Sequence, residues 1–161
     1  MKTAILTIST SVAAGRTEDR SGAALAELAA AAGAEIVARD VLPDDRASIE
    51  AWLRRRADEG VSLIFTTGGT GLTHDDVTPE ATRAVIDREA PGFAEAMRAQ
   101  SLKYTPMGIL TRGVSGIVGR TLIINFPGNP KAIGQLFPVV APTLGHVVAT
   151  LQREGGRTPG H

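Results

Sequence analysis

The sequence contains no cysteine. This absence excludes disulfide bonds, thiol catalysis and cysteine-ligated zinc, and it is typical of proteins in a reducing compartment. The three histidines form no cluster with metal-ligand spacing, so a zinc centre is not expected either. We therefore expect a cytoplasmic protein without disulfide bonds or thiol catalysis.

Neither sign of charge is in excess, because Lys plus Arg and Asp plus Glu each total 17 residues. Without an overall positive field, binding to nucleic acid or to an anionic membrane is not expected, and any anion must be bound locally. The apolar run within residues 1–10 is too short for a signal sequence, and no stretch approaches the roughly 18 to 20 apolar residues of a membrane span. We expect no nucleic-acid partner and no membrane-spanning segment.

The chain is 161 residues long and 43% apolar, which suits one domain with a single substantial core. We expect residues 1–154 to form this domain and residues 155–161 to be a flexible tail. No internal repeat and no linker divides the chain further.

Short apolar runs alternate with helix-forming segments along the chain. Strands are expected at Thr3–Ser9, Glu35–Leu42, Val61–Phe65 and Thr121–Phe126, with a brief strand and then a flexible loop within Thr105–Gly119. Helices are expected from Asp19 or Ser21 to about Ala32, from Asp44 or Asp45 to Gly60, over 79–87 and 91–102, and from Pro130 onward. This alternation predicts an α/β fold in three layers, with a mostly parallel central sheet and helices on both faces.

The strongest functional signal lies between Val61 and Ala81. An apolar strand there ends in the glycine-rich turn Gly68–Gly71, where positive φ angles can bring bare N–H groups close to an anion. A GGTG turn alone is more often structural, but the carboxylates of Asp75 and Asp76 follow it, and then Thr78 and Pro79 have the pattern of an N-cap and the first residue of a helix. Phosphate donors, metal-capable acids and a positive helix end therefore meet in one loop.

The other expected strand ends add a second acid and a second turn. Asp44 follows the strand at Glu35–Leu42, and Pro127-Gly128-Asn129-Pro130 follows the strand at Thr121–Phe126. Ligands of parallel sheets bind outside the carboxyl ends of the strands, so these positions should gather along one edge. Two carboxylates beside exposed N–H groups suit Mg²⁺ and phosphate. The alternative for Asp44 is a purely structural role as the N-cap of the next helix.

Five segments of the chain resemble, in order, the molybdopterin-binding domains of molybdenum-cofactor biosynthesis. The family includes the bacterial molybdopterin adenylyltransferases and the homologous domains of gephyrin and the plant cofactor-insertion protein. Its TxGGTGxxxxDxTPEA motif matches from Thr66 through Ala81. The other segments are DRSG at 19–22, LPDD at 42–45, PGF at 91–93, and LTRGVSGIVGRTLIINFPGNPKAI at 110–133.

The resemblance implies an activity and a role for particular residues. The family transfers AMP from Mg²⁺-ATP to the phosphate of molybdopterin and releases pyrophosphate. By this resemblance, Asp44 and Asp76 organise Mg²⁺ and the ATP phosphates. The ligand-binding residues implied are Gly68, Gly69, Thr70 and Gly71 around the bound ligand, and Arg112, Ser115, Pro127, Gly128 and Asn129 on the pterin-phosphate side.

The resemblance also implies a homotrimer, and other proteins of molybdenum-cofactor biosynthesis are possible partners. Surplus apolar surface around Phe93, Met97, Phe137, Val139 and Val140 agrees with an interface. One departure is visible: many family members carry Ser-Asp after the first strand, whereas Ser9 is followed here by Thr10. The alternative function is therefore a paralogue or scaffold of the same fold that binds molybdopterin without catalysis.

Overall fold

The computed structural model describes residues 1–153, so the tail expected at 155–161 lies outside the described residues. The elements, in chain order, are β1 (Lys2–Ile8), α1 (Thr10–Ala13), α2 (Arg20–Ala31), β2 (Glu35–Leu42), α3 (Arg46–Asp58), β3 (Leu63–Thr67), α4 (Thr78–Val85), β4 (Arg88–Glu89), α5 (Gly92–Ser101), the 3-10 helix η1 (Pro106–Leu110), β5 (Ser115–Val118), β6 (Thr121–Phe126), α6 (Pro130–Val140), the 3-10 helix η2 (Ala141–Thr143) and α7 (Leu144–Gln152).

Within the described residues, six strands form one sheet in the order β2-β1-β3-β6-β5-β4. The first four strands in this order run parallel, whereas β5 pairs antiparallel with both β6 and β4. The predicted mostly parallel α/β fold is confirmed. β2 lies at the sheet edge, as its polar interruptions indicated, and β1 lies inside the sheet.

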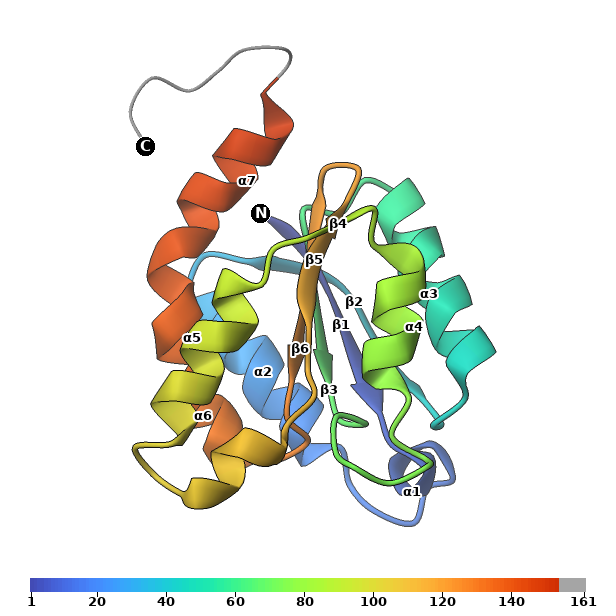
Figure 1. Ribbon diagram of the computed structural model, residues 1–161. Coiled ribbons are helices and arrows are strands. Elements are labelled where there is room, and N and C mark those ends of the chain that lie inside the picture. Colours follow the sequence, from blue (N-terminus) through green and yellow to red (C-terminus); the bar gives the residue numbers. More distant parts are fainter. Residues whose placement is uncertain (154–161) are drawn as a thin grey trace.

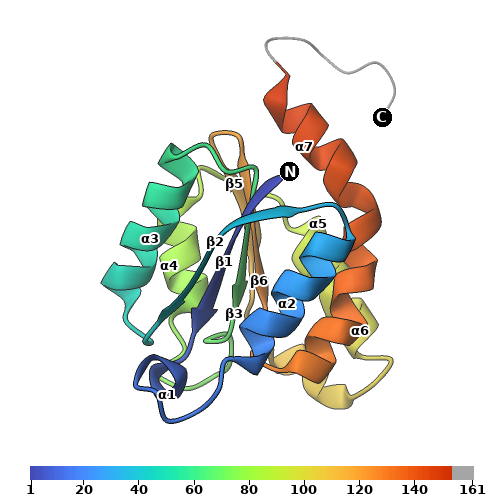
Figure 2. The same ribbon diagram turned by 180° about the vertical axis from the view of Figure 1, so that it is seen from behind.

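Alternating side chains of the central strands fill two separate cores. Ile5, Phe65 and Ile124 belong to the core on one face, together with residues of α2, α5, α6 and α7. Leu6, Ile64 and their neighbours belong to the core on the other face, together with residues of α3 and α4. Figures 1 and 2 show the resulting three layers from opposite sides. Burial on both faces explains why β1, β3 and β6 are nearly continuous apolar runs.

An aromatic cluster lies beneath the carboxyl ends of β3 and β6. The rings of Phe65 and Phe126 meet edge to face at 5.6 Å between centroids, and Phe137 of α6 lies 5.9 and 6.0 Å from them. Such pairs contribute about 0.5–1.5 kcal/mol each beyond their buried area. The cluster therefore gives the two glycine-containing turns above it a rigid base.

The segment before β6 differs from the sequence expectation. A strand was expected early in Thr105–Gly119, but Pro106–Leu110 is a 3-10 helix and the strand, β5, comes later at Ser115–Val118. The Thr105 side chain accepts a hydrogen bond from Met107 N, and Pro106 has no N–H to contribute to a strand ladder. β5 pairs with β6 through a two-residue turn in which Gly119 has a φ of +56°.

The run Pro130–Gln152 is one helical stretch of 23 residues whose mean hydropathy, 1.4, is high enough for a membrane span by length and composition. A helix from Pro130 onward was expected, but not one long and apolar enough to meet this criterion. Only 28% of its apolar window is buried inside the chain, and η2, containing Pro142, interrupts it between α6 and α7. Its buried residues include Ile133, Phe137 and Leu144, which belong to the core on the face of α2 and α5.

Candidate functional site

A polar cavity of about 510 Å³ lies at the carboxyl ends of the parallel strands. These ends point to the lower edge of Figure 1, beside α1. Asp44 and Asp76 both line the cavity, together with Gly68, Gly69 and Gly128. Asp44 after β2, Asp76 after β3 and the two glycine-containing turns therefore converge on one cavity, as predicted. Hydroxyl groups also line it, from Ser9, Ser11, Thr17 and Ser21 among others.

Asp44 is held by Thr10 at the end of β1. The Thr10 N–H and hydroxyl donate to Asp44 Oδ2 at 3.2 and 2.8 Å, and Asp44 N donates back to Thr10 Oγ1 at 3.1 Å. The neighbouring Asp45 is the N-cap of α3, with its side chain accepting from Ser48 N at 2.9 Å. The capping alternative for Asp44 is therefore wrong, and its Oδ1 is left available to a ligand.

Asp76 is held in the same way by Thr73. The Thr73 N–H and hydroxyl donate to Asp76 Oδ2 at 3.0 and 2.8 Å. Each acid thus has one carboxylate oxygen fixed by the N–H and hydroxyl of a threonine, and Oδ1 is the oxygen left for a ligand. This pattern restricts each carboxylate to one orientation without neutralising its charge.

The glycines of the third-strand loop are required by backbone conformation and close contacts. Gly68 and Gly69 have φ angles of +98° and +67°, as the sequence predicted. A Cβ on Gly69 would clash with Thr78 Oγ1 and come within 3.3 Å of Asp44 Oδ1, and one on Gly71 would come within 2.8 Å of Asp76 Oδ2. A larger residue at Gly69 would therefore displace Thr78, and one at Gly71 would displace the Asp76 carboxylate.

Thr78 does not cap α4 as expected. Val77 occupies the N-cap position without a side-chain bond, and Pro79 is one residue further into the helix than predicted. The Thr78 hydroxyl instead donates to the carbonyl of Gly68 at 2.9 Å, and Thr78 N donates to the carbonyl of Gly69 at 3.1 Å. The start of α4 thereby fixes the glycine turn. Thr70 is 6% exposed, so it supports the loop from inside.

The second turn packs directly against the first. A Cβ on Gly128 would lie 3.1 Å from the Cα of Gly68, and the Thr67 hydroxyl donates to the carbonyl of Pro127 at 2.8 Å. Asn129 caps α6 as predicted, with its side chain accepting from Lys131 N at 2.9 Å. The positive end of α6 therefore faces the polar cavity, which Pro130 also lines.

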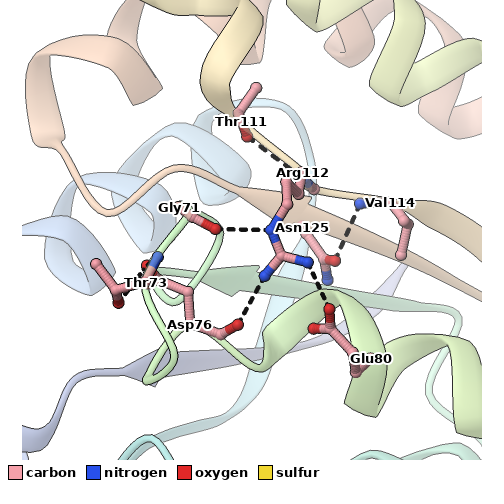
Figure 3. Close-up of polar contacts among 9 residues, drawn as sticks. Gly71, Thr73, Asp76, Glu80, Thr111, Arg112, Val114 and Asn125 are labelled. Atoms are coloured by element: carbon pink, nitrogen blue, oxygen red, sulfur yellow. Dashed lines mark hydrogen bonds and ion pairs between the residues drawn. The ribbon is translucent and has the colours of Figure 1, made fainter.

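Arg112 and Ser115 use their polar atoms inside the protein. All three guanidinium nitrogens of Arg112 donate within the chain, to Gly71, Asp76 and Glu80 (Figure 3). Ser115 is 2% exposed; its hydroxyl donates to Ala90 O at 2.6 Å and accepts from Ala94 N at 3.2 Å. This geometry favours structural roles for both residues over the substrate contact that the resemblance implied.

A second cavity, of about 130 Å³ and mainly apolar, lies on the other side of the Pro127 turn. Met97, Met107 and Leu136 contribute apolar atoms to its wall, and Asn125 and Arg98 contribute polar ones. Met107 is 62% exposed and lies at the surface of η1. The two cavities share the β6–α6 connection, since Pro127 lines one and Gly128 the other.

Several residues that organise the site were missed by sequence reasoning. Asn125, 2% exposed on β6, donates to the hydroxyls of Thr66 and Thr82. Its side-chain oxygen accepts from Val114 N at 3.1 Å, a contact drawn in Figure 3. A buried amide in an apolar strand needs such partners, so its occurrence in TLIINF is the signal that could have found it. The pairing of Thr10 with Asp44, 34 residues apart, leaves no local signal.

The donor set suits a hard cation that keeps much of its own water. Within residues 1–153, no group of three or more His, Cys, Asp or Glu side chains could hold a metal by itself. Two oriented carboxylates in a polar cavity are the protein share expected of a Mg²⁺ site completed by waters and substrate phosphates. Asp44 and Asp76 fit that requirement.

The fold and this cavity together define a three-layer α/β protein with a polar cavity outside the carboxyl ends of its parallel strands, where such sheets bind their ligands. A family model described as a probable molybdopterin binding domain matches residues 4–146. The chain therefore belongs to the molybdopterin-binding domain family, as the resemblance indicated.

Individual relatives support the same assignment. The chain is 48% identical over 109 residues to a molybdopterin adenylyltransferase of Haemophilus influenzae, covering 67% of this chain and 55% of that protein. It is 38% identical over 146 residues to the molybdenum cofactor synthesis protein cinnamon of Drosophila melanogaster, covering 89% of this chain and 24% of that protein. The matches thus span about half or less of these two relatives.

Solved structures match along nearly the whole chain. The molybdopterin biosynthesis enzyme MoaB of Thermus thermophilus superimposes with a TM-score of 0.88 at 44% identity, covering 93% of this chain and 95% of that one. The Mog protein of Mycobacterium ulcerans gives a TM-score of 0.88 at 35% identity, covering 93% and 98%. The predicted molybdopterin-binding-domain fold is confirmed.

Proposed function

We propose that the protein is a molybdopterin adenylyltransferase, which transfers AMP from Mg²⁺-ATP to the phosphate of molybdopterin and releases pyrophosphate. The observation that carries the proposal is the pair Asp44 and Asp76, each lining the polar cavity with one oxygen fixed by a threonine. The relatives named as molybdopterin adenylyltransferases add support.

The two cavities match the two chemical halves of this reaction. The polar cavity, with its hydroxyls, glycine N–H groups and the N-terminus of α6, suits the ATP phosphates. The apolar cavity suits the flat pterin, because such ring systems bind against apolar walls with a few placed polar groups. The phosphate of molybdopterin would then lie at the Pro127–Asn129 turn, between the two.

The reaction requires positioning and charge neutralisation more than a protein nucleophile. A phosphate oxygen of molybdopterin attacks the α-phosphorus of ATP, and the bond to the leaving pyrophosphate breaks as the new P–O bond forms. Mg²⁺, when bound by Asp44 and Asp76, supplies neutralisation of phosphate charge. The glycine turn excludes side chains from the approach of the phosphates, and the N–H of Gly69 binds them, since that of Gly68 already donates to Phe126 O at 3.1 Å.

The proposal includes a homotrimer in the cytoplasm, possible contacts with other proteins of molybdenum-cofactor biosynthesis, and no nucleic-acid or membrane partner. Of the apolar residues expected at an interface, Met97, Phe137 and Val140 are buried in the chain's own core, with exposures of 5, 2 and 2%. Phe93 and Val139 line a surface groove of about 180 Å³ between α5 and α6 and remain candidates. Light scattering at micromolar concentration tests the trimer, and a monomer that still adenylylates molybdopterin would exclude it.

The function is tested by incubating the protein with molybdopterin, ATP and Mg²⁺ and separating the pterin products. Adenylylated molybdopterin that requires both Mg²⁺ and ATP supports catalysis. Tight molybdopterin binding without product contradicts the proposal and identifies the chain as the non-catalytic paralogue or scaffold.

A further inference from the structure

Arg112 connects the segment before β5 to the loop that contains Asp76. Its Nε donates to the carbonyl of Gly71 and its Nη2 to the carbonyl of Asp76, both at 2.7 Å. Its own N–H donates to the carbonyl of Thr70 at 2.8 Å. Figure 3 shows the guanidinium lying between these carbonyl groups and the Glu80 side chain. The Arg112 side chain therefore binds the first and last residues of this loop, Gly71 and Asp76.

The loop between these two residues has little other support. Leu72, Thr73 and His74 are exposed, and the segment Gly71–Asp76 forms no helix or strand. Its internal bonds run between Thr73 and Asp76, so they shape the turn but do not attach it to the rest of the protein. Arg112 supplies that attachment. Within residues 1–153, the Asp76 carboxylate is fixed only to Thr73, so its place in the polar cavity depends on where the loop is held.

Glu80 and Arg98 hold Arg112 itself. Glu80, in the first turn of α4, accepts from Arg112 Nη1, and this bond keeps the pKa of the Glu80 carboxyl below its usual value, so the carboxylate is charged at neutral pH. Arg98 of α5 donates to the carbonyls of Thr111 and Gly113 at 3.3 and 3.0 Å. The backbone on both sides of Arg112 is thereby fixed.

We propose that Arg112 and Glu80 form a positioning pair that holds the 71–76 loop so that Asp76 stays in the polar cavity. The pair acts by orienting the acid, because each guanidinium nitrogen already donates one hydrogen to an internal acceptor. This role for Asp76 rests on the proposed function. A rigid, planar three-way contact of this kind is specific to arginine; lysine keeps the charge but cannot reproduce the fork.

The first test measures the loop without any substrate. Hydrogen exchange of the 70–77 segment is compared in the wild type, Arg112→Lys and Glu80→Gln. Both variants are expected to exchange faster there by about tenfold or more, since local opening becomes easier when its anchoring bonds are lost. Glu50→Gln is the matched control, because Glu50 also pairs with an arginine, Arg46, at 2.8 Å, but on α3. Unchanged exchange in both loop variants would overturn the proposal.

The second test separates positioning from substrate contact. Arg112→Lys and Glu80→Gln are each expected to lower kcat about 10- to 100-fold and to raise the Mg²⁺ concentration for half-maximal rate, because misplacement of about 1 Å can cost 100-fold. The molybdopterin Kd should stay within about twofold of the wild type, because neither variant removes a contact to bound molybdopterin. A weaker molybdopterin Kd in Arg112→Lys with wild-type behaviour in Glu80→Gln would instead identify Arg112 as a substrate ligand.

The double variant and the folding controls complete the experiment. Arg112→Lys/Glu80→Gln should lose no more activity than Arg112→Lys alone, because the two residues act as one unit. If Arg112→Lys has a much lower melting temperature, the exchange and kinetic tests are carried out with Glu80→Gln, which keeps a hydrogen-bond acceptor at this position. If the wild type makes no adenylylated product, the proposed function fails while the exchange result still tests the pair.

Discussion

Thr10 and Asp44 hold each other reciprocally: the threonine hydroxyl donates to Asp44 Oδ2 at 2.8 Å and accepts from Asp44 N at 3.1 Å. This contact lies after the first strand, where the family resemblance implied Ser-Asp and the sequence has Ser9-Thr10. Thr10 is exposed, so its contribution to the core is small. Thr10 therefore supplies a group that orients Asp44, although it differs from the residue that the resemblance implied.

Replacing Thr10 by valine removes the hydroxyl and keeps the shape of the side chain. We expect Thr10→Val to lower the adenylylation rate about tenfold, because a loosened catalytic group loses part of its orientation, with the melting temperature nearly unchanged. Thr10→Ser should retain most of the activity. The rate measured under saturating ATP decides, and wild-type turnover in Thr10→Val would show that Asp44 needs no such support.

Gly71→Ala places a methyl group within 2.8 Å of Asp76 Oδ2, so the carboxylate must move. We expect the specific activity of Gly71→Ala to fall strongly while its free energy of unfolding changes little. Both quantities are measured for the variant and the wild type. Gly134→Ala is the matched control: nothing lies within 4 Å of its Cβ, and alanine in a helix is favoured over glycine by about 0.5–1 kcal/mol. Equal activity in the two variants would contradict the close contact at Asp76.

Ser115→Ala tests whether this serine is structural. Removing its hydroxyl leaves the buried carbonyl of Ala90 and the N–H of Ala94 without their partner. We expect the free energy of unfolding to fall by about 1–3 kcal/mol, while the molybdopterin Kd of the folded protein stays the same. Urea denaturation and a binding titration measure the two quantities. Normal stability with weakened molybdopterin binding would instead support the substrate contact of Ser115 that the family resemblance implied.

Asp40, on the edge strand β2, makes the free energy of unfolding depend on pH. The indole N–H of Trp52 donates to its Oδ2 at 2.9 Å and Arg56 at 2.8 Å, and these bonds, the indole bond first, lower the pKa of the Asp40 carboxyl. A lowered folded-state pKa stabilises the protein above the unfolded-state value and loses that effect as the pH falls through the folded-state value.

The wild type should therefore exceed Asp40→Asn in unfolding free energy by a constant amount at neutral pH. The difference should shrink below about pH 4, near the unfolded-state pKa of aspartate. Denaturant titrations over a pH series give the comparison. A difference that stays constant to the lowest pH would show that the carboxylate charge is irrelevant to folding.

The central strands and the convergence of the loops could be predicted from sequence. Apolar runs fix β1, β3 and β6, and parallel strands necessarily bring their carboxyl ends to one edge, so Asp44 and Asp76 were placed correctly in one cavity. Asn129 was recognised as a cap because the pattern Asn-Pro after a strand is local.

The rest depends on contacts that sequence spacing does not encode. β5 is only four residues long and is defined by its pairing with β6, so its apolar pattern is too short to distinguish from that of η1. The family resemblance implied that Arg112 contacts the substrate, but its internal acceptors, which lie 32 to 41 residues earlier, had no signal in the sequence. Pairings over such separations follow from the topology and not from local pattern.

The most direct test of the account follows the α-phosphate of ATP in a single turnover with the wild type and Asp76→Asn. With ATP labelled at the α-phosphorus, the wild type should place the label on molybdopterin and release unlabelled pyrophosphate in equal amount. Asp76→Asn is expected to bind molybdopterin and fold normally but transfer label at least about 100-fold more slowly, as expected when transition-state charge stabilisation is lost. Label transfer by Asp76→Asn at the wild-type rate, or its absence in the wild type, would contradict the account.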